Sequence, residues 1–309
     1  MSIKKCLVIG DINIDFAIHS NYYPDEGGEA HAEQTDLRLG GSGCITAIYL
    51  QLLGQPTALA ANLGADVFSR FAGEHLGAAG LDISLVRNIP GEQTGFFMIL
   101  VTPGAQRTMF GNRGANAVAM DMDKVLSGLS EFGHLHVSGY SLLGNEQFKV
   151  VSQVMTKAKS SGITISLDPG VCTSEQAVEK ILGLLKYVDY FLPSQDELDS
   201  LIKDMEFEEK IETLLELGCK AVVLKQGKTG GKYFETGFAA SAPAESDPGK
   251  MIVDSTGAGD CFNAGFLSGI LNEKDPKEAL KLANAAAFRM ITSQHGIVEL
   301  IKVMGSFTG

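Results

Sequence analysis

Short apolar runs and amphipathic stretches alternate over the second half of the chain. The apolar run at residues 5–9 ends at Gly10-Asp11, which predicts a buried first strand of an α/β sheet. Further strands are expected at 134–138, 163–167, 188–192 and 221–224. Helices are expected between and after them, at 146–160, 174–186, 196–203, 260–271 and 276–291. The helix at 260–271 is apolar nearly all round, so we expect it to be buried. Strands separated by helices imply parallel βαβ units with right-handed crossovers.

The first third of the chain does not follow this alternation. Helices are expected at 43–53 and 68–79, with a buried strand between them at 57–63. Residues 11–16 alternate strictly, so an extended chain places Asp11, Asn13 and Asp15 on one face. We interpret the early short strands as a small sheet that projects from the main body, and expect them at 84–88, 95–101 and 107–110. This pattern predicts one domain over residues 1–309, with lid strands inserted from about 12–40 and 94–111.

Composition and charge narrow the function classes. Of the 309 residues, 45% are apolar and 20% are charged, which is ordinary globular composition. The net charge of −12 disfavours nucleic acid as a partner, because an acidic chain repels the phosphate backbone. No stretch approaches the ~20 apolar residues of a membrane span, so no membrane partner is expected. The five cysteines form no CxxC pair, which favours free thiols in a reducing compartment and a cytoplasmic location.

A run of residues with small side chains ends in Gly257, Ala258 and Gly259, directly before Asp260 and the apolar helix at 260–271. Small residues let a ligand approach the backbone, and the first N–H groups of a helix favour anions. These features predict a site for phosphate or for developing negative charge. A carboxylate there repels bound phosphate, so Asp260 is better suited to accept a proton from a hydroxyl group that attacks phosphorus. An ordinary first-turn aspartate is an equally open interpretation of the spacing alone.

The common nucleotide-binding motifs are absent. Gly227-Lys228-Thr229 imitates the end of a Walker A loop, but Val222 stands where that loop needs its first glycine. The first strand is not followed by GxGxxG, and Gly41-Ser42-Gly43 lacks the third glycine. These absences disfavour a P-loop enzyme and a dinucleotide-dependent dehydrogenase.

The segment 254–266 resembles the C-terminal signature of the ribokinase-like (PfkB) carbohydrate kinase family. Other family-like segments follow in family order over nearly the whole chain, at 10–15, 40–43, 63–66, 114–116, 225–230 and 283–286. The resemblance implies a ribokinase-like three-layer α/β/α sandwich with a mainly parallel central sheet and a small β-sheet lid. It also implies transfer of a phosphoryl group from ATP, with Mg²⁺, to a hydroxyl group of a sugar or sugar-like alcohol.

The same resemblance implies roles on the acceptor side. The signature would supply an anion hole and a catalytic base, formed by Gly257, Ala258, Gly259 and Asp260. Four earlier residues would bind the substrate, namely Asn13, Asp15, Gly40 and Gly41. Asn13 and Asp15 would act as paired hydrogen-bond acceptors for vicinal hydroxyls. The family usually has an asparagine where this chain has Ile45, which argues against assuming ribose as the acceptor.

A nucleotide and metal side is implied as well. The residues that would bind ATP are Ser194, Lys225, Gly227, Gly230 and Asn284. Lys225 would meet phosphate charge, and Ser194 stands where the family usually has an asparagine with a longer reach. Glu197 would help to hold Mg²⁺ through water. Asp254 and Thr256 would bind a monovalent cation such as K⁺.

Two alternatives to a sugar kinase stay open. One is a nucleoside kinase of the same family, and the other is a non-catalytic ligand-binding protein with a kinase fold, suggested by Ile45 and Ser194. The lid strands would carry exposed edges and an apolar face, so a homodimer through the lid is expected. Arg107 lies on a lid strand, where we expect it to be exposed to solvent.

Overall fold

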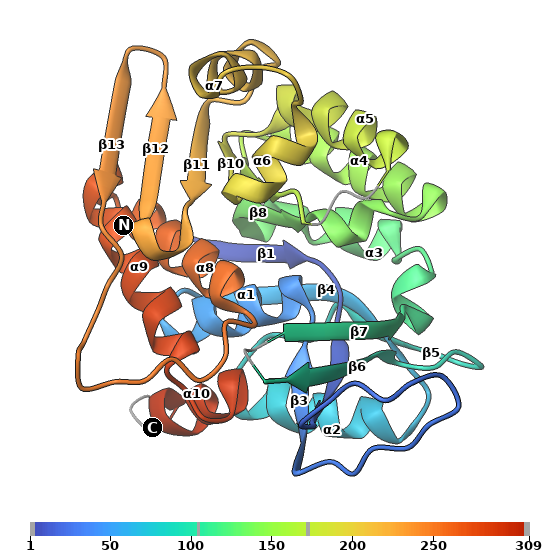
Figure 1. Cartoon of the computed structure of the whole chain (residues 1–309). Coiled ribbons are helices and arrows are strands. Elements are labelled where there is room, and N and C mark those ends of the chain that lie inside the picture. Colours follow the sequence, from blue (N-terminus) through green and yellow to red (C-terminus); the bar gives the residue numbers. More distant parts are fainter. Residues whose placement is uncertain (1–3, 104–105, 171–173, 306–309) are drawn as a thin grey trace.

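A nine-stranded sheet forms the centre of the protein in a computed structural model that describes residues 4–103, 106–170 and 174–305 (Figure 1). Its strands are β1 (Lys5–Ile9), β4 (Thr57–Gly64), β5 (Val86–Ile89), β8 (Phe132–Ser138), β9 (Thr164–Asp168), β10 (Tyr190–Phe191), β11 (Ala221–Lys225), β12 (Gly231–Glu235) and β13 (Phe238–Ala242). They lie in the order β13-β12-β11-β10-β9-β8-β1-β4-β5. The pairs β11–β12 and β12–β13 are antiparallel, and the other neighbouring pairs are parallel.

Alternate side chains of the central strands enter two separate cores. On β1, Cys6 and Val8 belong to one hydrophobic cluster, and Leu7 and Ile9 belong to the other. The first cluster is covered by α1 (Ser42–Leu52), α2 (Val67–Ala78), α8 (Ala258–Leu271), α9 (Pro276–Ile291) and α10 (Gly296–Gly305). The second is covered by α3 (Met122–Ser127), α4 (Asn145–Ser160), α5 (Glu175–Leu184), α6 (Gln195–Leu201) and α7 (Phe207–Glu216). The predicted three-layer α/β/α sandwich is therefore confirmed.

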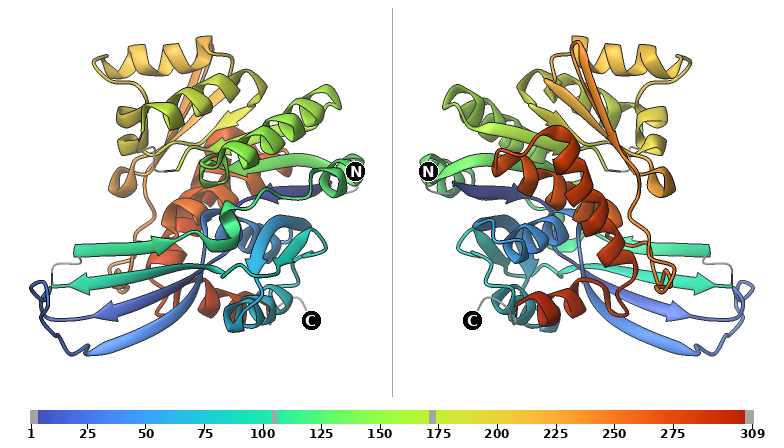
Figure 2. Two further views of the ribbon diagram at one scale, coloured as in Figure 1. Left: turned by 90° about the vertical axis from the view of Figure 1, so that its right-hand side faces the viewer. Right: turned by 90° about the vertical axis from the view of Figure 1, so that its left-hand side faces the viewer.

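A smaller sheet projects from one side of this body (Figure 2). It contains β2 (Asn13–His19), β3 (Gln34–Gly40), β6 (Gly95–Thr102) and β7 (Gln106–Asn112), in the order β3-β2-β6-β7. We call it the lid. Strand β2 follows β1 after a short connection, so the lid begins at the carboxyl end of the central strand. The predicted second, smaller sheet is confirmed.

Some predicted elements differ from the structure. The short strand expected at 84–88 is β5, which lies at the edge of the main sheet and not in the projecting sheet. Helix α2 crosses over after β4, and a crossover of this kind returns the chain parallel to the strand it left. The sequence patterns did not predict β12, β13, α3, α7 or α10, and the strand expected at 188–192 spans only Tyr190–Phe191.

Helix α8 begins two residues earlier than predicted, at Ala258. It is buried on nearly all sides, with Phe266 and Leu267 fully enclosed, as its apolar pattern indicates. Asp260 consequently stands in its first turn, as predicted. Within the described ranges, none of the helices has the length and apolar character needed to cross a membrane.

Candidate active site

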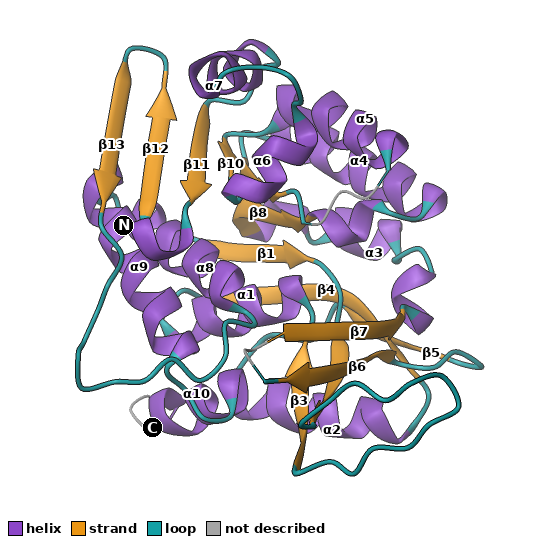
Figure 3. Cartoon of the chain, in the orientation of Figure 1, coloured by secondary structure: helices purple, strands orange, loops and turns teal. Residues whose placement is uncertain are grey.

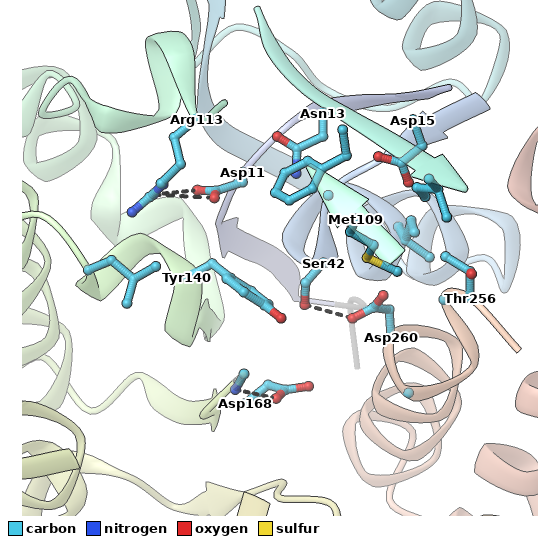
Figure 4. Close-up of a pocket in the computed structure, with 18 of the residues that line it drawn as sticks. Asp11, Asn13, Asp15, Ser42, Met109, Arg113, Tyr140, Asp168, Thr256 and Asp260 are labelled. Carbon is cyan, nitrogen blue, oxygen red and sulfur yellow. Dashed lines mark hydrogen bonds and ion pairs between the residues drawn. The ribbon is translucent and has the colours of Figure 1, made fainter. Parts of the chain in front are cut away.

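A cavity of about 340 Å³ lies where the carboxyl ends of β1 and β9, the N-terminus of α8 and the inner face of the lid meet (Figure 4). Open parallel sheets bind ligands in a crevice at this edge, outside the carboxyl ends of the strands. Six residues predicted for catalysis or substrate binding line the cavity together: Asn13, Asp15, Gly41, Gly257, Gly259 and Asp260. Gly40 and Ala258 are their sequence neighbours and do not line it.

The N-terminus of α8 presents unpaired amides to this cavity. Gly257, the residue directly before the helix, has φ +77°, a left-handed conformation that favours glycine. The amide of Ala258 donates to the Ser255 carbonyl oxygen at 3.3 Å. The amides of Gly259 and Asp260 have no acceptor within the part of the chain that the structure describes. They are therefore free to donate to an anion in the cavity, as the predicted anion hole requires.

Asp260 is a buried carboxyl group held in place by a serine. Ser42 Oγ donates to Asp260 Oδ1 at 2.6 Å. Burial raises the pKa of Asp260 to about 7, and the neighbouring charge of Asp168 acts in the same direction. A carboxylate with such a pKa is a stronger base than an exposed aspartate. Sequence reasoning gave Ser42 no role, although it belongs to the family-like segment 40–43.

Asp168 is a second residue that sequence reasoning missed. It is 4% exposed at the end of β9, and it accepts hydrogen bonds from Lys225 Nζ at 2.8 Å and from Asn263 Nδ2. Lys225 Nζ also lies 3.8 Å from Glu197 Oε2. Burial alone would lower the pKa of Lys225, but the charges of Asp168 and Glu197 outweigh it and raise that pKa. A carboxylate directly after a predicted parallel strand was the signal that could have identified Asp168.

The opposite end of the cavity holds Asn13 and Asp15, the residues predicted to bind the hydroxyl groups of the substrate. Asn116 Nδ2 donates to Asn13 Oδ1 at 2.8 Å and to the Ile12 carbonyl oxygen at 2.9 Å. Asn13 Nδ2 has no acceptor within the described residues, so Asn13 can donate to a ligand as well as accept through the second lone pair of its oxygen. Asp15 is a hydrogen-bond acceptor that no donor among the described residues occupies. Burial raises the pKa of its carboxyl group to about 7. The binding of substrate hydroxyls by Asn13 and Asp15 stays a prediction.

A buried ion pair completes this polar end. Arg113 Nη2 lies 3.3 Å from Asp11 Oδ2, and burial raises the pKa of Asp11 to about 6 although Arg113 opposes the shift. Gly41 has φ +97°, and a Cβ there would lie 2.2 Å from the Asp11 carbonyl oxygen. This close approach brings α1, and Ser42 with it, beside the polar end.

The lid and α1 give the cavity an apolar side. Phe97 and Ile99 on β6 and Met109 on β7 line it from the lid, and Ile45 lines it from α1. Figure 4 shows Met109 at the cavity. Ile45 is 4% exposed and lies 3.2 Å from the position of a Cβ at Gly257. It therefore forms an apolar wall between the polar end and the anion hole, where an asparagine would have offered a hydrogen bond.

Four of the residues predicted to bind ATP do not line the cavity, namely Ser194, Gly227, Gly230 and Asn284. Ser194 caps α6: its Oγ accepts from the Glu197 amide at 3.2 Å, and its amide donates to Glu197 Oε2 at 2.6 Å. Asn284 Nδ2 donates to the carbonyl oxygens of Ala242 and Pro243. Their contacts with ATP stay predictions.

The carboxylate of Asp254, predicted to bind a monovalent cation, is held by protein donors. Arg38 Nη1 lies 2.6 Å from Oδ2, and Arg107 Nη1 lies 3.5 Å from Oδ1. The amide and the hydroxyl of Thr256 also donate to Oδ1. Burial alone would raise the pKa of Asp254, but these hydrogen bonds outweigh it and lower the pKa. A cation does not fit this carboxylate. Arg107 is exposed, as expected, and it also binds the loop that contains Asp254.

No group of three or more His, Cys, Asp and Glu side chains in the described ranges could hold a metal ion unaided. Glu197, predicted to hold Mg²⁺ through water, nevertheless borders the cavity near the free amides of α8, whereas both oxygens of Asp168 accept hydrogen bonds from the protein. Oxygen ligands of this kind suit Mg²⁺, which keeps most of its waters and takes further ligands from bound phosphates. The residues present therefore fit a magnesium–nucleotide complex.

Comparison with known proteins gives a consistent result. The model of the pfkB family carbohydrate kinases matches residues 3–301. A 2-dehydro-3-deoxygluconokinase of Bacillus subtilis is 30% identical over 274 residues, covering 85% of this chain and 84% of that protein. The structure of Arabidopsis thaliana ribokinase with ribose and ATP superposes with a TM-score of 0.82 at 25% identity, covering 98% and 99% of the two chains. A ribokinase II candidate of E. coli with ATP and Mg²⁺ gives 0.82 at 25% identity and 99% of both chains. The chain belongs to the pfkB family of carbohydrate kinases.

Proposed function

We propose that this protein transfers the γ-phosphoryl group of ATP to a hydroxyl group of a sugar or sugar-like alcohol. The observation that carries the proposal is the position of Asp260. Its buried carboxylate lies beside the unpaired amides of α8, in a cavity whose other end holds hydroxyl-binding groups. This arrangement supports a base next to an anion hole, which is what phosphoryl transfer to an alcohol requires.

Each residue of the site has a separate task in this mechanism. Asp260 accepts the proton of the attacking hydroxyl while the new oxygen–phosphorus bond forms and the bond to the ADP oxygen breaks. The amides of Gly259 and Asp260 donate to the transferring group, and Ser42 keeps the carboxylate oriented. Lys225 Nζ lies 3.7 Å from the position of a Cβ at Gly259, so its charge faces the same phosphate.

ATP and Mg²⁺ are the proposed cofactors. Two structural neighbours were solved with ATP, and one of them also with Mg²⁺, which supports the same pair here. Bound Mg²⁺ would neutralise phosphate charge, and Glu197 would hold it through water. Four residues beyond the cavity are proposed to follow the nucleotide: Ser194, Gly227, Gly230 and Asn284.

The acceptor is proposed to place its hydroxyl groups against the polar end, where Asn13 can donate to them and Asp15 can accept. Its less polar face would lie against Phe97 and Met109 of the lid. The apolar lid also suits the base of a nucleoside, so a nucleoside kinase is the second candidate. The proteins of known activity that are similar to this chain support sugars and sugar acids first.

A phosphoryl-transfer assay tests this function. The purified protein is incubated with Mg²⁺ and ATP labelled in the γ-phosphate, with pentoses, hexoses, sugar phosphates, 2-keto-3-deoxy sugar acids and nucleosides in parallel. We expect transfer to at least one sugar or sugar acid, and transfer slower by ~10²–10⁴-fold with Asp260→Asn. Transfer to nucleosides alone would select the second candidate, and tight ligand binding without transfer to any alcohol would refute catalysis.

A homodimer through the lid is also proposed. The outer face of the lid carries a row of apolar side chains in register across four strands, Leu37, Phe16, Met98 and Phe110. Leu37, Met98 and Phe110 are 36%, 41% and 59% exposed in the single chain. Burial of such a row against a second lid would remove apolar surface from water. The cytoplasmic location stays a prediction, consistent with free buried thiols at Cys6, Cys44, Cys219 and Cys261.

A further inference from the structure

Two arginines of the lid bind the loop that leads into the anion hole. The segment 243–257 connects β13 to α8 without helix or strand (Figure 3). Near its end, Asp254 meets Arg38 of β3 at 2.6 Å and Arg107 of β7 at 3.5 Å. Arg107 also donates to Thr256 Oγ1 at 2.6 Å and to Ser255 Oγ at 3.0 Å. The loop is therefore attached to both edge strands of the lid.

These contacts saturate the carboxylate and balance the local charge. Asp254 Oδ2 accepts from Arg38, while Oδ1 accepts from Thr256 and Arg107. Arg38 Nε also donates to Asp36 Oδ2 at 2.6 Å, so this guanidinium lies between two carboxylates. Two guanidinium groups and two carboxylates compensate each other without an added ion. The side chain of Arg38 is only 14% exposed, so water screens this pairing little.

The space beside Asp254 is small and already faces a positive charge. A cavity of about 20 Å³ is lined by Arg38 and by two carboxyl groups, Asp254 and Asp15, and has room for a single water-sized occupant. A cation there would stand next to the Arg38 guanidinium, and like charges repel. Asp254 is engaged by protein donors, and burial raises the pKa of Asp15 to about 7, which disfavours its ionised form.

We infer that Arg38 and Arg107 take the place of a monovalent cation at Asp254, so that the protein works without K⁺. The inference rests on the proposed function only where it concerns the rate of phosphoryl transfer. Neither arginine is assigned a contact with substrate; both are positioning residues that act through the loop 254–256. That loop leads directly to Gly257 and the free amides of Gly259 and Asp260, so its position sets the position of the anion hole.

A comparison of cations tests the inference on the full chain. Phosphoryl transfer and thermal unfolding are measured at equal ionic strength in chloride salts of potassium, sodium and tetramethylammonium, which has no hydroxyl group, with ATP supplied as its Tris salt. We expect the same kcat and the same midpoint of unfolding in all three salts. A higher kcat or midpoint in potassium would overturn the inference, as would an anomalous-scattering peak for rubidium beside Asp254 in crystals. The unfolding and rubidium measurements do not depend on activity, so they separate this inference from the proposed function.

Variants of the two arginines provide the second arm. Arg38→Ala and Arg107→Ala are each expected to lower kcat about tenfold or more, with little change in the KM of the acceptor, because the anion hole is displaced. Potassium is expected to restore part of the loss, whereas Arg38→Lys keeps a charge and stays independent of potassium. Arg70→Ala, on the exposed surface of α2, is the matched control. The inference would be contradicted if Arg38→Ala and Arg107→Ala were as active as Arg70→Ala. Because Arg107 is partly exposed, its variant is the one that we expect to fold most readily.

Discussion

Asp260→Asn should inactivate the protein and stabilise it at the same time. The pKa of Asp260 is raised from 3.8 to about 7, because the folded chain removes this carboxylate from water. A difference of roughly 3 pKa units at about 1.4 kcal/mol each corresponds to about 4 kcal/mol. Above neutral pH, the folded state therefore holds an ionised group that the unfolded state solvates better. Asparagine is neutral at every pH, keeps an oxygen that can accept from Ser42, and removes this cost.

The dependence on pH gives the prediction its sign. Below the unfolded pKa, the carboxyl is protonated in both states and the substitution changes stability little. As the pH rises through the folded pKa, the natural protein loses stability and the variant does not. The free energy of unfolding gained by Asp260→Asn should therefore increase by about 3 kcal/mol between about pH 5 and about pH 8.

Urea unfolding of both proteins at the two pH values measures this difference, and the labelled-ATP assay measures the accompanying loss of kcat, expected at ~10²–10⁴-fold. Calorimetric titration should find the binding of Mg²⁺–ATP retained. Asp123→Asn, at an exposed position in the first turn of α3, is the control that should change neither activity nor the pH trend. Equal stability differences at both pH values would refute the reasoning that Asp260 is a desolvated base.

Three further outcomes follow from the site and the lid. Ser42→Ala removes a hydrogen bond that favours the ionised form of Asp260, so the acid limb of the pH profile of kcat/KM should move from about pH 7 to higher pH. An unchanged acid limb would show that Ser42 does not tune the base. Asn116→Ala loses three buried hydrogen bonds to the start of β2 and should cost about 2–4 kcal/mol in urea unfolding while raising the KM of the acceptor more than that of ATP. Phe110→Asp should yield a monomer in sedimentation, whereas Phe238→Asp, 47% exposed on β13 outside the lid, should leave the dimer intact; a natural protein that sediments as a monomer would contradict the lid interface.

The periodicity of the sequence predicted most of the main body. The four apolar residues 6–9 of β1 fit a strand buried on both faces, and the alternate assignment of their side chains to two cores explains why no polar position interrupts the run. The strand β5 was assigned to the wrong sheet, because four residues carry too little pattern to say which edge they join. Its partner was decided by the crossover of α2.

The candidate site was predicted in pieces that lie close together in the sequence. The helix start at 257–260 was recognisable because small residues, an unpaired helix end and a carboxylate occur within four positions. The partner of that carboxylate was not recognisable, since Ser42 is separated from Asp260 by 218 positions. The direction of the Asn13 amide likewise depends on Asn116, which is 103 positions away.

The sequence by itself determined the alternation of strands and helices, the buried helix α8 and the position of Asp260 in its first turn, since these depend on local spacing and backbone geometry. Only the tertiary structure decided which charges face each other. It paired Lys225 with Asp168 and Asp254 with two arginines of the lid, and it buried Asp260 deeply enough to change its pKa. Desolvation and Coulomb energies depend on distances in space between side chains, and those distances are set by the packing of elements far apart along the chain.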